Sequence, residues 1–290
     1  MEKVSLYIPC YNAGKTIREC LESILGQSYK ADEILVIDDG SGDGAAEIAR
    51  GFPVKIIRHN RNMGLAVSRN TAFKEARNEF VAALDADCTA DARWLERLMG
   101  CFTEEAIVGA GGKVIERHAL TIADKWRSTH MSQQWGDVSL ENPPFLYGSN
   151  TVFKKSGAKK AGFYTEKFRI NYEDVDLSKR VYDCGFKLVY NPEAQVLHAR
   201  RDTTRSILAT FWNWRKNEYM ESGCPDNIFR RIAYRIGYLV DNVDFFGSIF
   251  HEDMQGGNHD LLPLDFIFRW YCLWQESKSL LRELLPFDRR

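Results

Sequence analysis

The sequence predicts an α/β protein in which a mostly parallel central sheet is flanked by helices and followed by a helical C-terminal extension. Short apolar segments alternate with segments of helical period through the first two thirds of the 290 residues. Two of the apolar segments, 33–37 and 80–84, run directly into paired acids. After Thr204 the pattern is helical to the end. We therefore expect an α/β domain at 1–203, with halves at 1–105 and 106–203, and a helical extension at 204–290.

The expected elements follow from the period of the apolar residues. Strands are expected at 4–8, 34–37, 54–57 and 80–84, and helices at 14–25, 45–49, 65–76 and 92–102. This alternation implies right-handed crossovers between parallel strands. The pattern weakens from 106 to about 144, after which we expect strands at 150–153 and 188–190 and a helix between them at 175–184. The extension should contain amphipathic helices at 228–250 and 265–285.

Composition and charge argue against several classes of protein. The 39 basic and 40 acidic residues nearly cancel, so no overall field attracts nucleic acid or an anionic membrane. The seven cysteines are scattered without a C-x-x-C pair, which favours a reducing compartment over a disulfide scaffold or a zinc site. The sequence shows no leader and no uncharged apolar run of membrane-spanning length. We expect a cytoplasmic protein that binds no nucleic acid, with peripheral contact at the inner face of the membrane as an alternative.

Paired acids end two of the expected parallel strands, as Asp38-Asp39 and as Asp85-Ala86-Asp87. The carboxyl ends of parallel strands lie at one edge of an open sheet, where ligands bind. Carboxylates gathered there raise each other's pKa unless a cation or a hydrogen-bonding ligand lies among them. A divalent metal fits this arrangement, and so does a polyhydroxy ligand.

Further motifs occur in a fixed order around these acids. They are Pro9-Cys10-Tyr11-Asn12, Asp38-Asp39-Gly40-Ser41, Asn62-Met63-Gly64, Ser68-Arg69-Asn70, Asp85-Ala86-Asp87, Gly148-Ser149-Asn150, Glu173-Asp174 and Val196-Leu197-His198. Together they resemble the family 2 glycosyltransferases of the GT-A nucleotide-sugar-binding fold, from Val4 to about Arg201. The sequence has no Q-x-x-R-W signature of polymerising members, although Trp212-Asn213-Trp214-Arg215 is loosely similar. A single transfer is therefore expected rather than polymerisation.

The resemblance implies a nucleotide pocket formed by Pro9, Tyr11, Asn12, Asp39, Arg69 and Asp85. Tyr11 offers a ring face for stacking, and the Asp39 carboxylate suits the N3 hydrogen of uracil. Thymine presents the same edge and guanine also has ring N–H donors, so the base stays open. Asp85 is expected to hold the ribose hydroxyls, and Arg69 to reach the base or the diphosphate.

The resemblance also implies a metal site and a catalytic acid pair. Asp87 and His198 match the metal ligands, so Mn²⁺ or Mg²⁺ is the expected cofactor, and it would stabilise the leaving diphosphate. Asp174 matches the general base that an inverting reaction needs, and Glu173 is expected to orient the acceptor. The acceptor loop matches Gly148, Ser149 and Asn150.

These residues imply that one sugar is transferred from a nucleotide-diphosphate sugar, with UDP preferred, to a hydroxyl group. The acceptor would be a cell-surface polysaccharide, a lipid-linked glycan or a protein glycan. Two other readings are a nucleotide-sugar-binding module without activity and a nucleotidyltransferase. The first predicts a damaged acid pair or metal motif and the second a Gly- and Arg-rich loop near the start, and the sequence shows neither.

The tail is rich in aromatic residues, among them Phe266, Phe268, Trp270 and Trp274. Aromatic residues in this number are not expected to remain in water. Three ways of burying them are considered, in order of preference: packing on the catalytic domain, a homodimer interface, and the surface of a membrane. The membrane ranks last because nearby acids offset most of the attraction of the basic residues for anionic headgroups.

Overall fold

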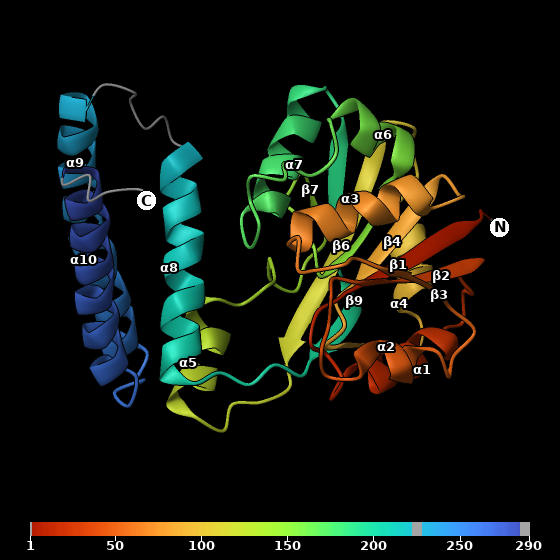
Figure 1. Cartoon of the computed structure of the whole chain (residues 1–290), viewed down its shortest axis with the longest axis horizontal. Helices are drawn as coiled ribbons and strands as arrows, with labels where there is room; N and C mark the ends of the chain where they lie inside the picture. Colours follow the sequence, from red (N-terminus) through yellow and green to blue (C-terminus); the bar gives the residue numbers. More distant parts are fainter. Residues whose placement is uncertain (1, 222–227, 285–290) are drawn as a thin grey trace. The chain divides into compact units, whose positions relative to one another are not determined.

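The computed structural model describes residues 2–221 and 228–284 (Figure 1). The chain divides into two compact units. The first comprises Met1–Arg117 and Ser132–Arg200, and the second comprises His118–Met131 and Arg201–Arg290. This division differs from the expected one, since residues 118–131 leave the α/β domain and pack with the C-terminal helices.

Within its described residues, the first unit is built on a nine-stranded sheet in the order β3-β2-β1-β4-β8-β6-β9-β5, with β7 paired to β9. The strands are β1 (Val4–Cys10), β2 (Glu33–Asp38), β3 (Lys55–Arg58), β4 (Phe80–Leu84), β5 (Cys88–Ala90), β6 (Ile107–Glu116), β7 (Leu140–Glu141), β8 (Asn150–Lys154) and β9 (Lys187–His198). The neighbours β3, β2, β1 and β4 are parallel, and β6 is parallel to β9. Strands β8, β5 and β7 run against their neighbours. The α/β class with a central sheet is confirmed.

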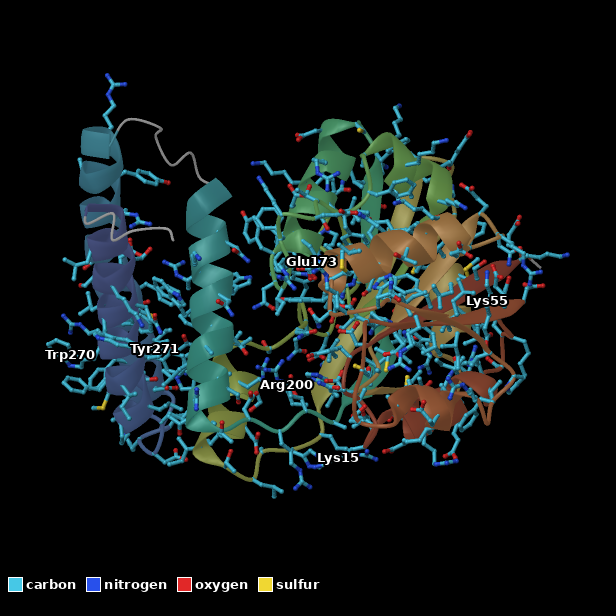
Figure 2. All side chains as sticks on the ribbon, viewed as in Figure 1. Lys15, Lys55, Glu173, Arg200, Trp270 and Tyr271 are labelled. Carbon is cyan, nitrogen blue, oxygen red and sulfur yellow. The ribbon has the colours of Figure 1, made fainter. Side chains whose placement is uncertain are left out.

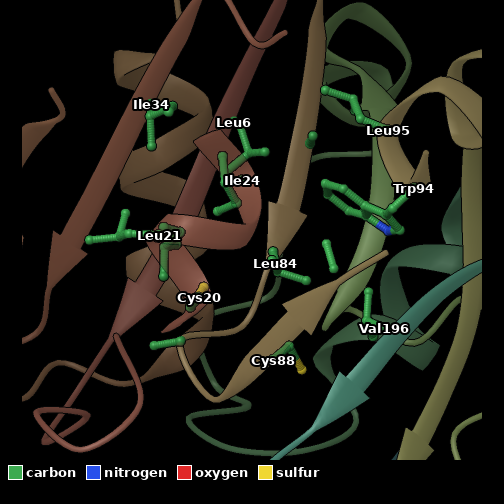
Figure 3. Close-up of a cluster of buried hydrophobic side chains, with 14 of the residues drawn as sticks. Leu6, Cys20, Leu21, Ile24, Ile34, Leu84, Cys88, Trp94, Leu95 and Val196 are labelled. Carbon is green, nitrogen blue, oxygen red and sulfur yellow. The ribbon is translucent and has the colours of Figure 1, made fainter. Parts of the chain in front are cut away.

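Helices cover both faces of this sheet (Figure 1). One face carries α1 (Ile17–Leu25), α2 (Ala45–Ala49) and α4 (Trp94–Met99), and the other carries α3 (Leu65–Glu75), α6 (Lys155–Lys160) and α7 (Glu173–Asp183). Along β1 the side chains alternate, with Leu6 and Ile8 in the first core and Tyr7 in the second. Figure 3 shows the first core, where Ile24 lies beside Leu6 and Trp94 lies farther along the same face of the sheet. Burial on both faces explains why these strands are continuous apolar runs in the sequence.

Strand β6, with the longer course of β9, is the main element that the sequence pattern does not reveal. Its apolar residues are interrupted by Gly109, Gly111 and Gly112, which removes the periodic signal. The glycines serve close packing: a Cβ at Gly112 would lie 1.9 Å from the carbonyl oxygen of Ala194. The pairing of β6 with β9 brings Glu116 opposite His198 at the edge that carries the paired acids.

The second unit consists, in its described part, of α5 (Ile122–His130), α8 (Thr204–Glu221), α9 (Ile228–Gln255) and α10 (Leu262–Leu284). The Thr121 side chain starts α5 by accepting a hydrogen bond from the backbone N–H of Asp124, and Asp124 reciprocates in a capping box. The helices share a core that includes Trp126, Phe211 and Phe268. Leu285, expected as the end of the last helix, lies outside the described residues.

The aromatic residues of α10 divide into buried and exposed ones. Phe268 is fully buried within the helical unit itself, an arrangement that differs from the three expected from the sequence. Phe266, Trp270 and Trp274 are each more than half exposed in this chain, so their burial against a second copy or a membrane stays a prediction. Trp270 is labelled on α10 in Figure 2. Over the residues that the structure describes, every helix is too short or too polar to cross a membrane.

Candidate active site

The end of β9 and the segment after β4 bring His198 and Asp87 together. His198 Nε2 lies 3.3 Å from Asp87 Oδ2, and His198 Nδ1 lies 2.9 Å from a carboxylate oxygen of Glu116. Burial alone would lower the pKa of His198, but the hydrogen bonds to Asp87 and Glu116 outweigh it and raise the pKa to about 10. The imidazole is thus oriented by one carboxylate and presents its other nitrogen to Asp87.

This pair fits a divalent metal. Imidazole nitrogen and carboxylate oxygen are ligands that Mn²⁺ accepts, and a ligating histidine commonly has its other nitrogen bonded to a carboxylate, as here to Glu116. Cys88 also lies within reach of Asp87 and His198, but its side chain belongs to the apolar core, and burial raises the pKa of its thiol. A protonated thiol is a poor ligand for a hard cation, so Asp87 and His198 are the two side chains of this group that suit a divalent metal.

Glu116 was not predicted from the sequence. Glu116 is the last residue of β6, whose glycines interrupt the alternation of apolar residues that would identify a strand. Its position beside His198 follows from the pairing of β6 with β9, which the sequence pattern does not reveal. The usable signal was an acid at the end of an apolar segment, Val114-Ile115-Glu116, the same signal that identified the other acids.

The nucleotide loops lie at the ends of β1 and β2, and they are tied to each other. The backbone N–H of Asn12 donates to Ser41 Oγ at 2.9 Å, and Gly42 N–H donates to Asn12 Oδ1 at 3.0 Å. Pro9 is buried within β1, so it supports this loop from the sheet. Tyr11 is 51% exposed, which leaves its ring free for stacking.

Asp39 is held beside this loop by the segment before α3. The backbone N–H groups of Met63 and Gly64 donate to its two carboxylate oxygens at 2.8 and 2.9 Å, and His59 Nδ1 lies 2.7 Å from Oδ1. A carboxylate has about four acceptor positions, so Oδ2 keeps one for a further donor. His59 carried no signal in the sequence, and its contact with Asp39 is a finding of the structure.

Arg69 is buried between Asp85 and Glu173. It is only 2% exposed, and its guanidinium lies 2.8 Å from Glu173 Oε1 and 3.5 Å from Asp85 Oδ1. These ion pairs occupy the guanidinium in this structure, and the contact of Arg69 with the base or the diphosphate stays a prediction. Through these two contacts Arg69, on α3, connects the segment after β4 with the start of α7. Figure 2 shows Glu173 at the start of α7, next to α3.

The two acids at the start of α7 have different surroundings. Glu173 is buried, and desolvation raises its pKa to about 7 against the opposing charge of Arg69. Asp174 is only partly buried, and its Oδ2 accepts a hydrogen bond of 3.0 Å from the backbone N–H of Gly148. A Cβ at Gly148 would lie 2.0 Å from Arg69 Nη1, so only glycine brings this loop against the buried arginine.

The rest of the expected acceptor loop turns inward. Asn150 is fully buried, accepts from Trp94 Nε1 at 2.6 Å and donates to the carbonyl oxygens of Lys113 and Ala194. The Ser149 hydroxyl donates to Gln133 at 2.7 Å. All the polar atoms of the Asn150 side chain thus hold the loop in place, and the assignment of this loop to the acceptor stays a prediction.

A group of half-buried aromatic residues lies next to this loop. The rings of Trp135 and Tyr147 are stacked with centroids 5.5 Å apart, and Phe145 packs edge-on against both. Burial, and then the charge of Asp174, raises the pKa of Tyr147. The weak pattern between 106 and 144 gave no indication of this group.

Two solved glycosyltransferase structures resemble this chain in fold. The mannosyltransferase PcManGT from Pyrobaculum calidifontis, solved with GDP-Man and Mn²⁺, has a TM-score of 0.63 at 15% identity, over 94% of this chain and 88% of that one. GalNAc-T7, solved with UDP, GalNAc and Mn²⁺, has a TM-score of 0.57 at 19% identity, over 76% of this chain and 48% of that one. This chain thus spans about half of GalNAc-T7. The fold is that of the GT-A glycosyltransferases.

The sequence relatives are consistent with this class. Glycosyltransferase AglE of Haloferax volcanii is 28% identical over 207 residues, which are 68% of this chain and 67% of that protein. The model of glycosyl transferase family 2 matches residues 5–170, more than half of the chain. The chain belongs to glycosyl transferase family 2.

Proposed function

We propose that this chain is a metal-dependent inverting glycosyltransferase that moves one sugar from a nucleotide-diphosphate sugar to a hydroxyl group. The observation that carries the proposal is the position of Arg69. Its guanidinium contacts both Asp85, at the donor edge, and Glu173, in the acid pair. Asp85, the proposed donor residue, and the proposed acid pair are therefore close to each other, which supports a direct displacement.

Asp174 is the proposed general base. The acceptor oxygen attacks the anomeric carbon, its proton passes to Asp174, and the bond from the anomeric carbon to the phosphate oxygen breaks with its electrons on the nucleoside diphosphate. Asp174 suits this role because it is partly exposed and oriented by Gly148 N–H. Glu173 is buried against Arg69, so it suits the positioning of the site and not proton transfer from a substrate.

Asp87 and His198 would hold the metal, with Glu116 fixing the imidazole. A bound Mn²⁺ or Mg²⁺ would neutralise the charge that develops on the leaving diphosphate. Both structural neighbours named above were solved with Mn²⁺, which supports this cofactor.

A UDP-sugar is the proposed donor. The exposed ring of Tyr11 can stack on a base, and Asp39 Oδ2 keeps one acceptor position for a ring N–H. Asp85 is proposed to hold the ribose hydroxyls. One neighbour was solved with UDP and the other with GDP-Man, so the base must be settled by experiment.

The acceptor is proposed to be a saccharide, whether part of a polysaccharide, a lipid-linked glycan or a protein glycan. The stacked rings of Trp135 and Tyr147 beside Asp174 support this choice, because a sugar presents an apolar face of C–H groups to an aromatic ring. The free, buried thiols of Cys10 and Cys20 support a reducing compartment, and we propose the cytoplasm.

A donor screen tests the function. Purified protein is incubated with UDP-, dTDP- and GDP-sugars, Mn²⁺ and short saccharide acceptors, while nucleoside diphosphate release and the configuration of the product are measured. We expect release from one UDP-sugar and a product of inverted configuration. A retained configuration would reject the single displacement, and release from GDP-sugars alone would reject the assignment of the base.

A further inference from the structure

The helical unit contains a buried cluster of three potential metal ligands that the proposed reaction does not use. His130 ends α5, Asp253 lies near the end of α9, and Asp265 lies in the first turn of α10. His130 Nε2 and one oxygen of each carboxylate all lie within 4.8 Å of one another. The three helices thus converge on one point.

These carboxylates lie among aromatic and aliphatic side chains. The core around them includes Trp126, Phe268 and Leu261, and Asp253 and Asp265 are at most 2% exposed. Buried carboxylates are costly unless they are paired or coordinate a metal.

The hydrogen bonds around the cluster leave one oxygen of each acid for the centre. Trp126 Nε1 donates to Asp265 Oδ1 at 2.7 Å, and Asn258 Nδ2 donates to Asp253 Oδ1 at 3.1 Å. Asp253 Oδ2 lies 2.8 Å from His130 Nε2. Asp265 Oδ2 is buried and has no hydrogen-bond partner in the described part of the chain. Carboxylates that bind metals are typically held in this way, with one oxygen accepting a hydrogen bond from the surrounding protein and the other facing the metal.

We propose that His130, Asp253 and Asp265 form a structural site for a divalent transition metal, foremost Zn²⁺. One imidazole nitrogen and two carboxylate oxygens suit Zn²⁺, with water as a fourth ligand. Zn²⁺ binds such nitrogen- and oxygen-containing sites more tightly than Mn²⁺, and Mg²⁺ prefers to keep its waters. Ligand atoms around tetrahedral zinc lie about 3.4 Å apart at bond lengths of about 2.1 Å, so small side-chain rotations would complete the site.

The site would join three helices that come from distant parts of the sequence. His130 belongs to the short segment 118–131, whereas Asp253 and Asp265 lie in the C-terminal helices. A metal that binds only the folded arrangement stabilises it by mass action. The proposed role is therefore to hold α5 against α9 and α10, independently of sugar transfer.

The test uses the full chain carrying Asp87→Asn, which removes a ligand of the other metal site. After chelation and dialysis against micromolar Zn²⁺, bound zinc is counted by mass spectrometry and thermal unfolding is followed by calorimetry. We expect one zinc per chain and a melting temperature several degrees higher with Zn²⁺ than with EDTA. Adding Asp265→Asn or His130→Gln should remove both effects.

Asp260→Asn is the matched control, because Asp260 is an exposed acid of the same region that pairs with Lys125. It should leave zinc content and the melting temperature unchanged. If the ligand variants do not fold, Co²⁺ is titrated into the Asp87→Asn chain, where visible bands of a tetrahedral site support the proposal and their absence rejects it. Equal zinc content with and without Asp265→Asn, or no effect of Zn²⁺ on the melting temperature, would also reject it.

Discussion

His198 holds a proton in the metal-free protein, because its bonds to Asp87 and Glu116 raise its pKa to about 10. A metal at Nε2 must displace that proton. Binding of Mn²⁺ should therefore release about one proton at pH 7, and its affinity should rise about tenfold per pH unit between pH 6 and 8. Calorimetric titrations in two buffers of different ionisation enthalpy measure the release. A release close to zero would show that His198 is not a ligand.

The general base is tested by Asp174→Asn, which keeps the shape of the side chain but cannot accept the proton. We expect turnover to fall by about 10²- to 10⁴-fold while the affinity for nucleoside diphosphate stays nearly the same. Asp183→Asn, an exposed acid at the other end of α7, serves as the control and should leave both unchanged. Lost nucleotide affinity with normal turnover would place Asp174 in the donor pocket instead.

At the scale of elements, the connection between α3, β4 and α7 depends on Arg69. Replacing it by Met leaves the buried Glu173 and the partly exposed Asp85 without their cation, so Arg69→Met should lower the free energy of unfolding by about 3–5 kcal/mol. Urea denaturation measures this change. Arg50→Met removes an exposed arginine paired with Glu47 and should change stability little. Similar stability of the two variants would mean that Arg69 does not hold these elements together.

The elements that the sequence predicted well are those with a strong apolar period. The strands at 4–10, 33–38 and 80–84 were recognisable because they are buried on both faces. Strand β6 was missed because close packing against β9 requires glycines, which have no side chain to show a period. The same holds for the site residues. The acids that end apolar strands were predicted from the sequence. Glu116 and His59 were not, because their positions depend on contacts between segments far apart in the sequence. The burial of Arg69 against Glu173 was not predicted, because it is set by tertiary packing, which a helix position does not reveal.

At the scale of the whole molecule, the two units have separate cores, so a change in one should leave the other intact. Phe268→Ala removes a fully buried ring from the helical core and should destabilise that unit by about 3–5 kcal/mol. Trp270→Ala, on the same helix but 57% exposed, should have little effect. Calorimetry of the two variants separates them. Equal destabilisation would indicate that Trp270 is covered by a second copy or another surface in solution.

Metal binding by Asp87 and His198 is central to the proposed sugar transfer, and one measurement tests it most directly. Release of nucleoside diphosphate from the preferred donor is followed with Mn²⁺ and with excess EDTA, for the unchanged chain and for Asp87→Asn. We expect the unchanged chain to release nucleoside diphosphate with Mn²⁺ but not in EDTA. Asp87→Asn should stay folded and release none under either condition. Full release in EDTA by the unchanged chain would contradict the account.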